Sequence, residues 1–380
     1  MKKELMLHAT ASFGLEAVVR RELEELGIAV NKIEQGHVLF SGDEATLALA
    51  NIALGASDRI LIELARFPVT DFEGLYEAVA TMEWAQWVSP RGFFQLDAKC
   101  VQSALHSPRD VQRIVKKAIL DALRRRYPWD HFPEDGEIYP LEITIRKDEC
   151  LICLNTSGEG LFKRGYREAK GAAPLKETMA RGLIDLSFWY ADRPLVDPFC
   201  GSGTILIEAA RKTRGMDPGL DRDFAYLHWP CMEEKIFKQV RAQRLKRISW
   251  EGSLDLLGFE IDPDLCKVAH ENACRAEVGD DIIFVPKDMR EAGLADNFGV
   301  IITNPPYGKR LEELARVEQL MEDFRDRFLP LRTWSFFLLT ALTNLEEIFD
   351  RPADRRRKLF NGGVETTYYQ FHGPNPKDFI

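Results

Sequence analysis

The sequence lacks the features that mark membrane, secreted and nucleic-acid-coating proteins. Its longest apolar stretch, at 334–339, is interrupted by Ser335 and is far shorter than the roughly 18 apolar residues that cross a bilayer. No apolar core follows the basic start of the chain, which argues against a signal peptide. The formal net charge of −9 excludes a uniformly basic chain but leaves room for a local basic face. We therefore expect a cytoplasmic protein with no membrane association.

Cysteine is scarce, scattered and odd in number. The seven cysteines show no regular spacing, which is typical of a reducing compartment and not of a disulfide framework. Cys150 and Cys153 form a C-x-x-C pair in an apolar, strand-like run, and no second pair follows. Two interpretations are open, a zinc site or two buried thiols. The missing second pair favours buried thiols and no metal.

The length of 380 residues exceeds what one hydrophobic core usually serves, so we expect two or three domains. Residues 1–55 and 56–165 each predict a small α+β domain. Beyond a basic linker, residues 166–380 alternate helices with short apolar strands, which predicts a Rossmann-like α/β domain with a mostly parallel sheet. The strands expected there are 194–197, 256–261, 282–285, 300–303, 335–340, 357–360 and 365–371. Nothing in the sequence indicates the oligomeric state.

A basic helix is predicted to begin at Ser107-Pro108, with serine as N-cap and proline at the first helical position. Outside its apolar face it carries seven basic residues, namely Arg109, Arg113, Lys116, Lys117, Arg124, Arg125 and Arg126. These residues fit either a solvated helix face or contacts to RNA phosphates. An insertion at 214–250, also rich in lysine and arginine, leaves the same choice open. There the solvated helix is the favoured interpretation.

The sharpest local signal is the run DPFCGSGT at 197–204. A strand ends in Asp197, Gly201 and Gly203 turn the chain tightly, and a helix follows. In open α/β sheets, ligands bind at the carboxyl ends of strands beside such turns. A phosphate-binding P-loop is excluded because no Gly-Lys-Ser/Thr follows, and a dinucleotide loop would need a third glycine. The loop alone therefore identifies no ligand.

Acidic residues follow the next two predicted strands. Glu260 can accept hydrogen bonds from both ribose hydroxyls of a nucleoside, and Ile261 can pack on the adenine face. Glu260 lies 63 positions after Asp197 (260 − 197), well beyond the usual spacing of about 20, and the insertion accounts for the excess. Asp288, followed by Met289, can accept a hydrogen bond from the adenine amino group. A lone acid after a strand is more often a turn former, but its place in this series favours ligand binding.

The run NPPYG at 304–308 directly follows the fourth predicted strand. An aromatic exocyclic amine is a poor nucleophile because its lone pair is delocalised into the ring. The side-chain oxygen of Asn304 and a neighbouring proline carbonyl can accept the two amine hydrogens, which favours a pyramidal nitrogen. Pro305 and Pro306 fix the backbone, and Tyr307 offers a stacking face for an extruded base. A mere proline turn fits this segment alone, but not the ordered series of strand-end signals.

Five motifs together resemble the THUMP-containing RNA methylase family, and the resemblance covers nearly the whole chain. They are RGYR at 164–167, APLKET at 173–178, DPFCGSGTILIEAA from 197, NPPYGKRL from 304 and LFNG at 359–362. The family includes bacterial 23S rRNA guanine-N2 methyltransferases and is often labelled N6-adenine-specific DNA methylase by motif alone. The resemblance implies a ferredoxin-like domain at 1–55, a THUMP RNA-binding domain at 56–165 and a class I methyltransferase domain at 166–380. The second activity of longer, fused members is expected to be absent.

The resemblance further implies S-adenosyl-L-methionine as cofactor, RNA as partner and guanine N2 of 23S rRNA as target. The expected cofactor-binding residues are Pro174, Lys176, Thr178, Asp197, Phe199, Cys200, Gly201, Ser202, Gly203, Glu260, Ile261, Asp288 and Met289. The expected catalytic residues are Asn304, Pro305, Pro306 and Tyr307. The expected RNA-binding residues are Arg113, Lys116, Lys117, Arg164 and Arg167. Alternatives are adenine N6 in DNA, a glutamine side chain in a protein, or a non-catalytic RNA-binding or assembly protein.

Overall fold

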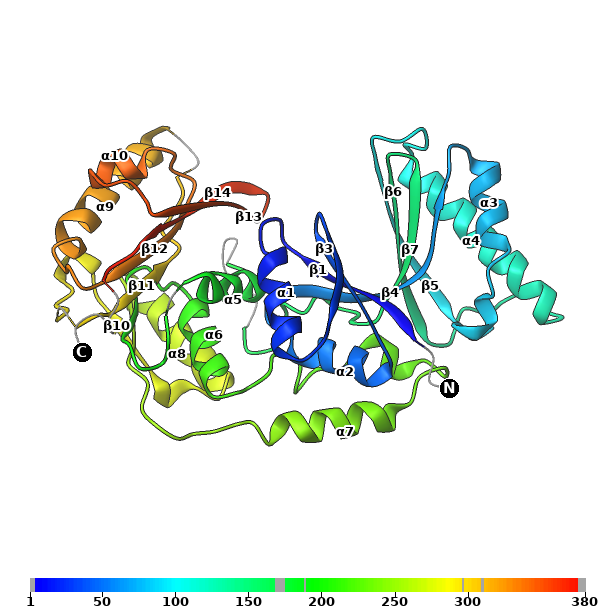
Figure 1. Ribbon diagram of the computed structural model, residues 1–380, viewed down its shortest axis with the longest axis horizontal. Helices are drawn as coiled ribbons and strands as arrows, with labels where there is room; N and C mark the ends of the chain where they lie inside the picture. Colours follow the sequence, from blue (N-terminus) through cyan, green and yellow to red (C-terminus); the bar gives the residue numbers. More distant parts are fainter. Residues whose placement is uncertain (1–3, 168–174, 188, 296, 309–310, 375–380) are drawn as a thin grey trace. The chain divides into compact units, whose positions relative to one another are not determined.

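The computed structural model describes residues 4–167, 175–187, 189–295, 297–308 and 311–374. The chain divides into two compact units (Figure 1). Unit 1 comprises Met1–Thr10, Leu23–Leu161 and Gly219–Arg244, and unit 2 comprises Ala11–Glu22, Phe162–Pro218 and Leu245–Ile380. Each unit therefore draws on separate stretches of the sequence.

Unit 1 is built on one seven-stranded sheet with the order β2-β3-β1-β4-β7-β6-β5. Its strands are β1 (Leu5–Ala11), β2 (Val30–Glu34), β3 (His37–Gly42), β4 (Ser57–Pro68), β5 (Phe93–Val101), β6 (Ile138–Arg146) and β7 (Glu149–Asn155). The long strand β4 lies between β1 and β7 and pairs antiparallel with β7. Strands from both predicted N-terminal α+β domains therefore belong to one continuous sheet.

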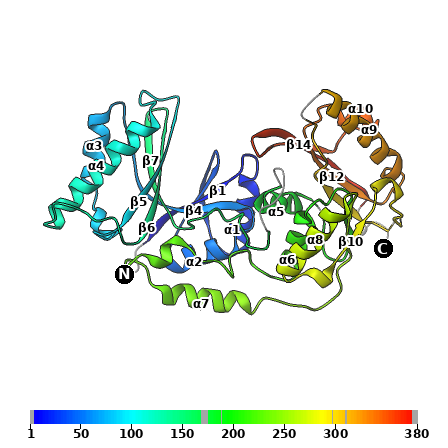
Figure 2. The same ribbon diagram turned by 180° about the vertical axis from the view of Figure 1, so that it is seen from behind.

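The basic helix forms where the sequence predicts it. Helix α4 (Pro108–Arg126) has Ser107 as N-cap, and the Ser107 hydroxyl accepts a hydrogen bond from the Asp110 amide at 3.4 Å. Its apolar residues are buried, among them Val111, Val115 and Ile119. Together with α3 (Phe72–Ala80) it covers one face of β5, β6 and β7 (Figures 1 and 2). The remaining helices of the N-terminal half are α1 (Glu16–Glu25) and α2 (Glu44–Ala53).

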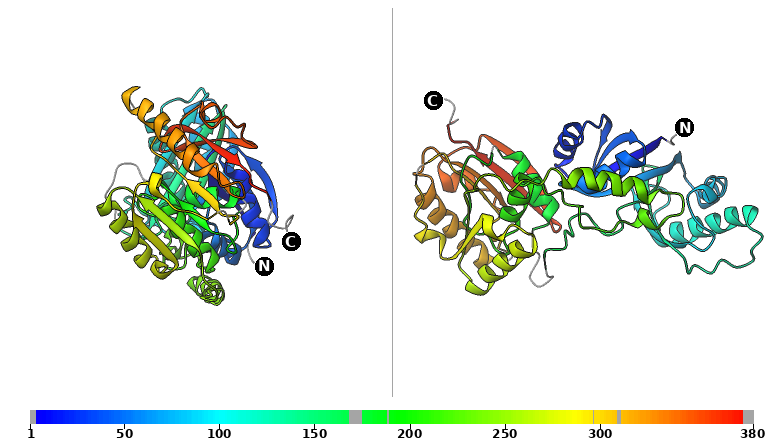
Figure 3. Two further views of the ribbon diagram at one scale, coloured as in Figure 1. Left: turned by 90° about the vertical axis from the view of Figure 1, so that its left-hand side faces the viewer. Right: turned by 90° about the horizontal axis from the view of Figure 1, so that it is seen from below.

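The insertion at 214–250 contributes an aromatic cluster to unit 1. The indole nitrogen of Trp229 donates to the Ile138 carbonyl at 2.9 Å, and its ring stacks on Tyr139. Helix α7 (Glu234–Leu245), lime green in Figure 3, buries only Phe237 and leaves its lysines exposed. This geometry fits the favoured interpretation of a solvated helix, and an RNA contact of the insertion stays a hypothesis.

Unit 2 contains the second seven-stranded sheet, with the order β10-β9-β8-β11-β12-β14-β13. Its strands are β8 (Leu195–Asp197), β9 (Leu256–Glu260), β10 (Ile282–Pro286), β11 (Val300–Thr303), β12 (Ser335–Thr340), β13 (Arg355–Asn361) and β14 (Val364–Phe371). Strands β8 to β12 run parallel, whereas β14 is antiparallel to both β12 and β13. The predicted Rossmann-like sheet is confirmed. The strand order reverses between β8 and β11, which is where such sheets bind ligands.

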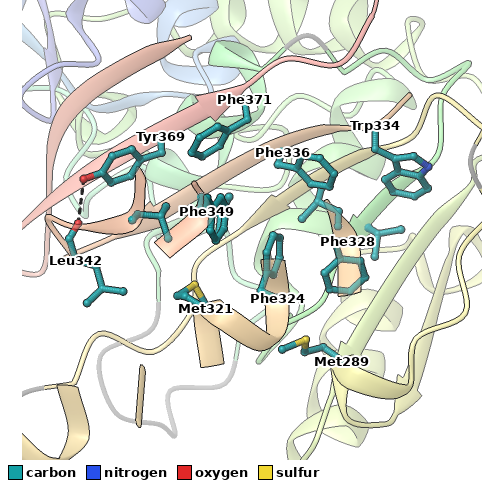
Figure 4. Close-up of a cluster of buried hydrophobic side chains, with 14 of the residues drawn as sticks. Met289, Met321, Phe324, Phe328, Trp334, Phe336, Leu342, Phe349, Tyr369 and Phe371 are labelled. Atoms are coloured by element: carbon teal, nitrogen blue, oxygen red, sulfur yellow. Dashed lines mark hydrogen bonds between the residues drawn. The ribbon is translucent and has the colours of Figure 1, made fainter. Parts of the chain in front are cut away.

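Helices cover both faces of this sheet. Helices α5 (Glu177–Leu186), α6 (Thr204–Thr213) and α8 (Pro263–Arg275) lie on one face, and α9 (Leu311–Phe328) and α10 (Leu345–Phe349) lie on the other (Figures 1 and 2). Under α9, the rings of Phe324 and Phe349 stack 5.6 Å apart within a cluster that includes Phe336 and Phe371 (Figure 4). Val196 and Ile301 bring β8 and β11 into the same cluster, so packing fixes the strands whose ends carry the predicted site.

The C-x-x-C pair lies on β7, where residues three positions apart point to opposite faces of the sheet. Burial raises the pKa of the Cys150 thiol to about 12 and raises that of Cys153 as well. Two side chains on opposite faces cannot ligate one ion, so the structure gives these residues the role of buried thiols. Among the described residues, no cluster of three or more His, Cys, Asp or Glu side chains is placed to hold a metal. Within the same residues, no helix is long and apolar enough to span a membrane.

Candidate functional site

The strand ends of unit 2 bring the two strongest sequence motifs together. Strands β8 and β11 are parallel neighbours, so Asp197 and Thr303 end at the same edge of the sheet. The Thr303 hydroxyl donates to Oδ1 of Asp197 at 2.6 Å, and the Phe199 amide donates to the same oxygen at 3.1 Å. One carboxyl group therefore joins the start of the glycine loop to the residue that precedes the NPPYG turn.

Asp197 is deeply buried, with 2% of its surface exposed. Burial raises the pKa of its carboxyl group to about 7, and nearby Glu260 adds to the rise, whereas the hydrogen bonds from Thr303 and Phe199 oppose it. The ordinary pKa of 3.8 thus moves close to neutrality. The protonation state of the Asp197 carboxyl group therefore depends on the groups that surround it.

The glycine loop adopts a conformation that only glycine adopts readily. Gly201 and Gly203 have φ angles of +52° and +82°. A Cβ atom on Gly203 would also lie only 2.9 Å from the Phe284 ring. Gly203 is the N-cap of α6, so the loop runs into the unpaired amides at a helix N-terminus. The Asn272 side-chain amide donates to the Ser202 carbonyl at 3.0 Å and holds the loop in place.

Two side chains of this loop point into the protein. The Phe199 ring stacks on Phe324 of the α9 core, and the Cys200 side chain packs against Gly258 of β9. Burial raises the pKa of the Cys200 thiol well above its ordinary value. The buried Cys200 side chain leaves its backbone as the group that could meet a cofactor, whereas Phe199 is only partly buried and its predicted contact stays a prediction.

Glu260 lies across from the loop at the end of β9. Its Oε2 accepts a hydrogen bond from the Gly201 amide at 3.1 Å, and its Oε1 accepts one from the Asp262 amide at 3.0 Å. Each carboxylate oxygen can accept a second hydrogen bond, which leaves acceptors for two ribose hydroxyls. The adjacent Ile261 side chain is 67% exposed, an unusual state for isoleucine and one suited to covering a nucleobase.

Asp288 and Met289 follow β10. Asp288 is the N-cap of a short 3-10 turn, and its Oδ1 accepts hydrogen bonds from the Arg290 amide at 2.9 Å and the Arg290 side chain at 3.1 Å. The turn-forming role is thus present, and the adenine contact stays a prediction. Met289 is 2% exposed and belongs to the core beneath α9 (Figure 4). Its side chain therefore does not support the predicted cofactor contact.

The NPPYG turn begins at Asn304, one residue after β11. Pro305 is buried, whereas Pro306 is exposed. The Tyr307 hydroxyl donates to Oδ1 of Asn304 and accepts a hydrogen bond from the side-chain amide of Asn361 at 2.9 Å. Burial raises the pKa of Tyr307 to about 12, so the hydroxyl keeps its hydrogen at neutral pH. Asn361 was not among the predicted site residues, and its only signal in the sequence was the LFNG motif.

The segment predicted to cover the cofactor is described in part. Pro174 lies outside the described residues. Lys176 is the N-cap of α5, and its ammonium group lies 4.6 Å from the centre of the Phe162 ring. The Thr178 side chain is buried in the first turn of α5. A direct cofactor contact of Lys176 or Thr178 remains a prediction.

The two linker arginines are not placed to bind RNA. The Arg164 side chain is 1% exposed and its Nε lies 3.7 Å from Glu208. Arg167, 13% exposed, donates to the Leu175 carbonyl at 2.9 Å, bonds the Thr204 hydroxyl and pairs with Glu177. Both arginines thus form ion pairs with buried acids, Glu208 of α6 and Glu177 of α5. Their predicted RNA contacts are corrected to a role in holding the linker against α5 and α6.

The basic face of α4 is accessible. Arg109, Arg113 and Lys116 line an open cavity of about 700 Å³ together with Phe94 of β5. Arg113 pairs with Asp110 in the same helix, and Lys116 pairs with Glu134. Lys117 is exposed and lies 5.3 Å from the centre of the Tyr76 ring. The prediction that Arg113, Lys116 and Lys117 meet RNA phosphates is compatible with this exposure.

The fold of unit 2 and its strand-end site define a class I methyltransferase: a mostly parallel sheet with a glycine loop, a carboxylate and an NPPY turn at one edge. The chain belongs to the RMKL-like methyltransferase family, and residues 164–370 match the methyltransferase domain of that family. An RlmL ferredoxin-like domain matches residues 6–61, and a THUMP domain matches residues 69–155. The family predicted from the motifs is confirmed.

Several known proteins resemble the chain over nearly its whole length. YpsC of Bacillus subtilis strain 168, named as a candidate RNA methyltransferase, is 41% identical over 97% of this chain and 96% of its own length. The crystal structure of SMU.472, described as a candidate methyltransferase in complex with S-adenosylhomocysteine, is 39% identical with a TM-score of 0.93, covering 99% of this chain and 100% of that one. A Listeria monocytogenes structure, described as a predicted N6-adenine-specific DNA methylase, is 38% identical with a TM-score of 0.92, covering 98% of this chain and 97% of that one.

Proposed function

We propose that this protein transfers a methyl group from S-adenosylmethionine to an exocyclic amine of an RNA base, specifically to N2 of a guanine in 23S rRNA. The observation that carries the proposal is the bridge made by Asp197. Its carboxyl group binds both the glycine loop, through Phe199, and the strand that leads into the NPPYG turn, through Thr303. This bridge supports a nucleoside site and an amine site at one edge of the sheet.

The residues present fit S-adenosylmethionine. In this proposal Glu260 accepts the ribose hydroxyls, Ile261 covers the adenine, and the backbone of Gly201 to Gly203 approaches the ligand closely. The hydrogen bond of Glu260 to the glycine loop, the exposure of Ile261 and the positive φ angles of the glycines support these roles. SMU.472, which is 39% identical, binds S-adenosylhomocysteine, the demethylated form of this cofactor. When bound, the cofactor supplies an electrophilic sulfonium methyl group.

The NPPYG turn supplies the groups that prepare the amine. Oδ1 of Asn304 and the carbonyl of a neighbouring proline accept the two amine hydrogens, so the nitrogen lone pair is directed away from them and toward the cofactor side. The buried ring of Pro305 fixes the backbone of this turn. Holding amine and methyl group in this geometry can contribute roughly 7–11 kcal/mol to lowering the barrier. The amine nitrogen forms its bond to the methyl carbon as the carbon–sulfur bond breaks, and the methylated amine then gives one proton to water. No covalent enzyme intermediate is required.

RNA is favoured over DNA as substrate. YpsC is named as a candidate RNA methyltransferase, and the THUMP domain carries the exposed basic residues of α4. The Listeria structure is described as a predicted DNA adenine methylase, and an adenine N6 amine would fit the same turn. The NPPYG turn therefore does not separate the two bases. The accessory RNA-binding domain is the feature that favours RNA.

Methyl transfer from radiolabelled S-adenosylmethionine tests the proposal. The purified protein is incubated separately with 23S rRNA lacking the modification, with total tRNA and with unmethylated DNA, and the products are digested to nucleosides. We expect the label in N2-methylguanosine from 23S rRNA. Label only in DNA N6-methyladenine would replace it with the DNA alternative. RNA binding with no transfer to any substrate would favour the assembly protein.

A further inference from the structure

The end of strand β13 reaches the catalytic turn through one side chain. Asn361 is the last residue of β13, and the glycines that follow it, Gly362 and Gly363, turn the chain with φ angles of +56° and +84°. The Asn361 side chain is nearly buried, with 9% of the residue exposed, and its amide nitrogen lies 2.9 Å from the Tyr307 hydroxyl. A residue 54 positions away in sequence therefore contacts the NPPYG turn directly.

The three polar side chains form a relay with a fixed direction. A tyrosine hydroxyl has one hydrogen to donate. Tyr307 gives it to Oδ1 of Asn304, so its own oxygen acts as the acceptor for the Asn361 amide. The high pKa of Tyr307, which burial raises to about 12, keeps this hydrogen in place at neutral pH. Because Asn361 donates to the Tyr307 oxygen, Tyr307 must donate to Asn304. The hydrogen bond from Asn361 therefore determines which atom of the Asn304 amide faces Tyr307.

The direction matters because an asparagine amide carries an acceptor on one side and donors on the other. The amine to be methylated presents hydrogens, so Asn304 must turn its oxygen toward the amine. The oxygen has two lone pairs, of which Tyr307 occupies one and the amine can use the other. If the relay ran in reverse, the NH2 group of Asn304 would lie where the oxygen should be and would confront the amine hydrogens.

We propose that Asn361 is a positioning residue for methyl transfer, which acts through Tyr307 to keep the side-chain oxygen of Asn304 directed at the target amine. This inference rests on the proposed function, since it assumes that an amine binds at Asn304. It gives the LFNG motif a chemical role, and it gives the Tyr307 hydroxyl a role separate from stacking by the ring.

Two near-isosteric variants separate direction from packing. Asn361→Leu removes the donor but offers Tyr307 no competing acceptor, so the hydroxyl still donates to Asn304. We expect kcat to fall about 5-fold, as for one lost hydrogen bond of ordinary strength. Asn361→Asp places a carboxylate there, which takes the Tyr307 hydrogen and reverses the relay. We expect kcat to fall about 100-fold, because a buried donor then faces the amine.

A double-mutant cycle with Tyr307→Phe excludes a general effect of a buried charge. In the Tyr307→Phe background no hydroxyl exists to be captured, so adding Asn361→Asp should change kcat less than about 3-fold. A carboxylate that harmed the site merely by its charge would lower kcat equally in both backgrounds. The KM for S-adenosylmethionine should be unchanged in all variants, because Asn304, Tyr307 and Asn361 are not among the residues expected to bind the cofactor.

The hydrogen bond is also measurable without turnover, by hydrogen exchange of the Asn361 side-chain amide in ¹⁵N-asparagine-labelled protein. If the relay exists, the Asn361 side-chain amide should exchange at least about 10-fold faster in Tyr307→Phe than in the unaltered protein, because the variant lacks the hydroxyl that accepts its hydrogen bond. Equal exchange rates would overturn the relay whether or not the protein methylates RNA. Slow exchange together with no transfer to any RNA would instead overturn the proposed function. Additive losses of kcat across the cycle would overturn the positioning role.

Discussion

The buried carboxyl group of Asp197 leads to a quantitative prediction about the pH dependence of stability. Burial raises the pKa of Asp197 from its ordinary 3.8 to about 7. Between these two values the folded protein binds more protons at this site than the unfolded chain does. The free energy of unfolding therefore falls as pH rises from about 4 to about 7, and levels off above pH 7. Asp197→Asn, which is neutral and similar in shape, should lack this contribution.

The size of the effect follows from the shift. A rise of about 3 pKa units, at about 1.4 kcal/mol per unit, corresponds to about 4 kcal/mol. The free energy of unfolding of Asp197→Asn minus that of the unaltered protein should thus rise by about 4 kcal/mol between pH 4 and pH 7. Taking the difference between the two proteins cancels the titration of the other groups.

Equilibrium urea unfolding at half-unit intervals from pH 4 to pH 8 measures this difference. Asp192→Asn, which removes a carboxylate at an exposed position of the same unit, is the matched control. A difference curve for Asp197→Asn that is flat across the range would refute the buried, proton-sensitive carboxyl group. A difference that instead fell as pH rose from pH 4 would mean that the hydrogen bonds from Thr303 and Phe199 outweigh burial and lower the pKa of Asp197.

Substitutions at Glu260, at Asn304 and on the basic face of α4 test three separate roles. Glu260→Ala should weaken S-adenosylmethionine binding roughly 10- to 100-fold, because charge-assisted hydrogen bonds are lost. Unchanged affinity by calorimetry would show that Glu260 is not the acid that binds the cofactor. Asn304→Ala should keep cofactor affinity but lose methyl transfer, and normal turnover would contradict its role. Joint replacement of Arg113, Lys116 and Lys117 by alanine should weaken RNA binding and lower the slope of log affinity against log salt by about 2. An unchanged slope would mean that α4 does not contact phosphates.

The parts of the fold that could be predicted from the sequence are those set by local patterns. The short strands of unit 2 form at the apolar segments that the sequence predicted as strands between helices. Helix α4 begins at Ser107-Pro108, as the capping pattern predicts. The glycine loop and the NPPYG turn could be placed at one edge because parallel strands of a sheet share an orientation. Local chemistry and sheet topology were sufficient there.

Contacts between distant residues could not be predicted. Arg164 and Arg167 were expected to face RNA because they lie in a basic linker, but their acidic partners Glu208 and Glu177 come from α6 and α5. Nothing local in the sequence indicates those pairings. The contact of Asn361 with Tyr307 has the same origin, since it depends on β13 lying at the edge of the sheet.

Side-chain direction was also hidden from the sequence. Met289 directly follows a predicted ligand, yet its side chain turns into the core beneath α9. The continuous sheet of unit 1 was not expected either. The sequence predicted that β4 begins a second domain, but β4 lies between β1 and β7 in one sheet. Both outcomes depend on packing between elements and not on any local motif.

Nucleoside analysis of ribosomal RNA tests whether this protein methylates guanine N2 in 23S rRNA. 23S rRNA is isolated from a strain in which the gene is deleted, and from the same strain carrying either the unaltered gene or the Asn304→Ala variant. We predict that one N2-methylguanosine is missing in the deletion strain, returns with the unaltered gene and stays missing with the variant. Identical nucleoside profiles in all three strains would contradict it.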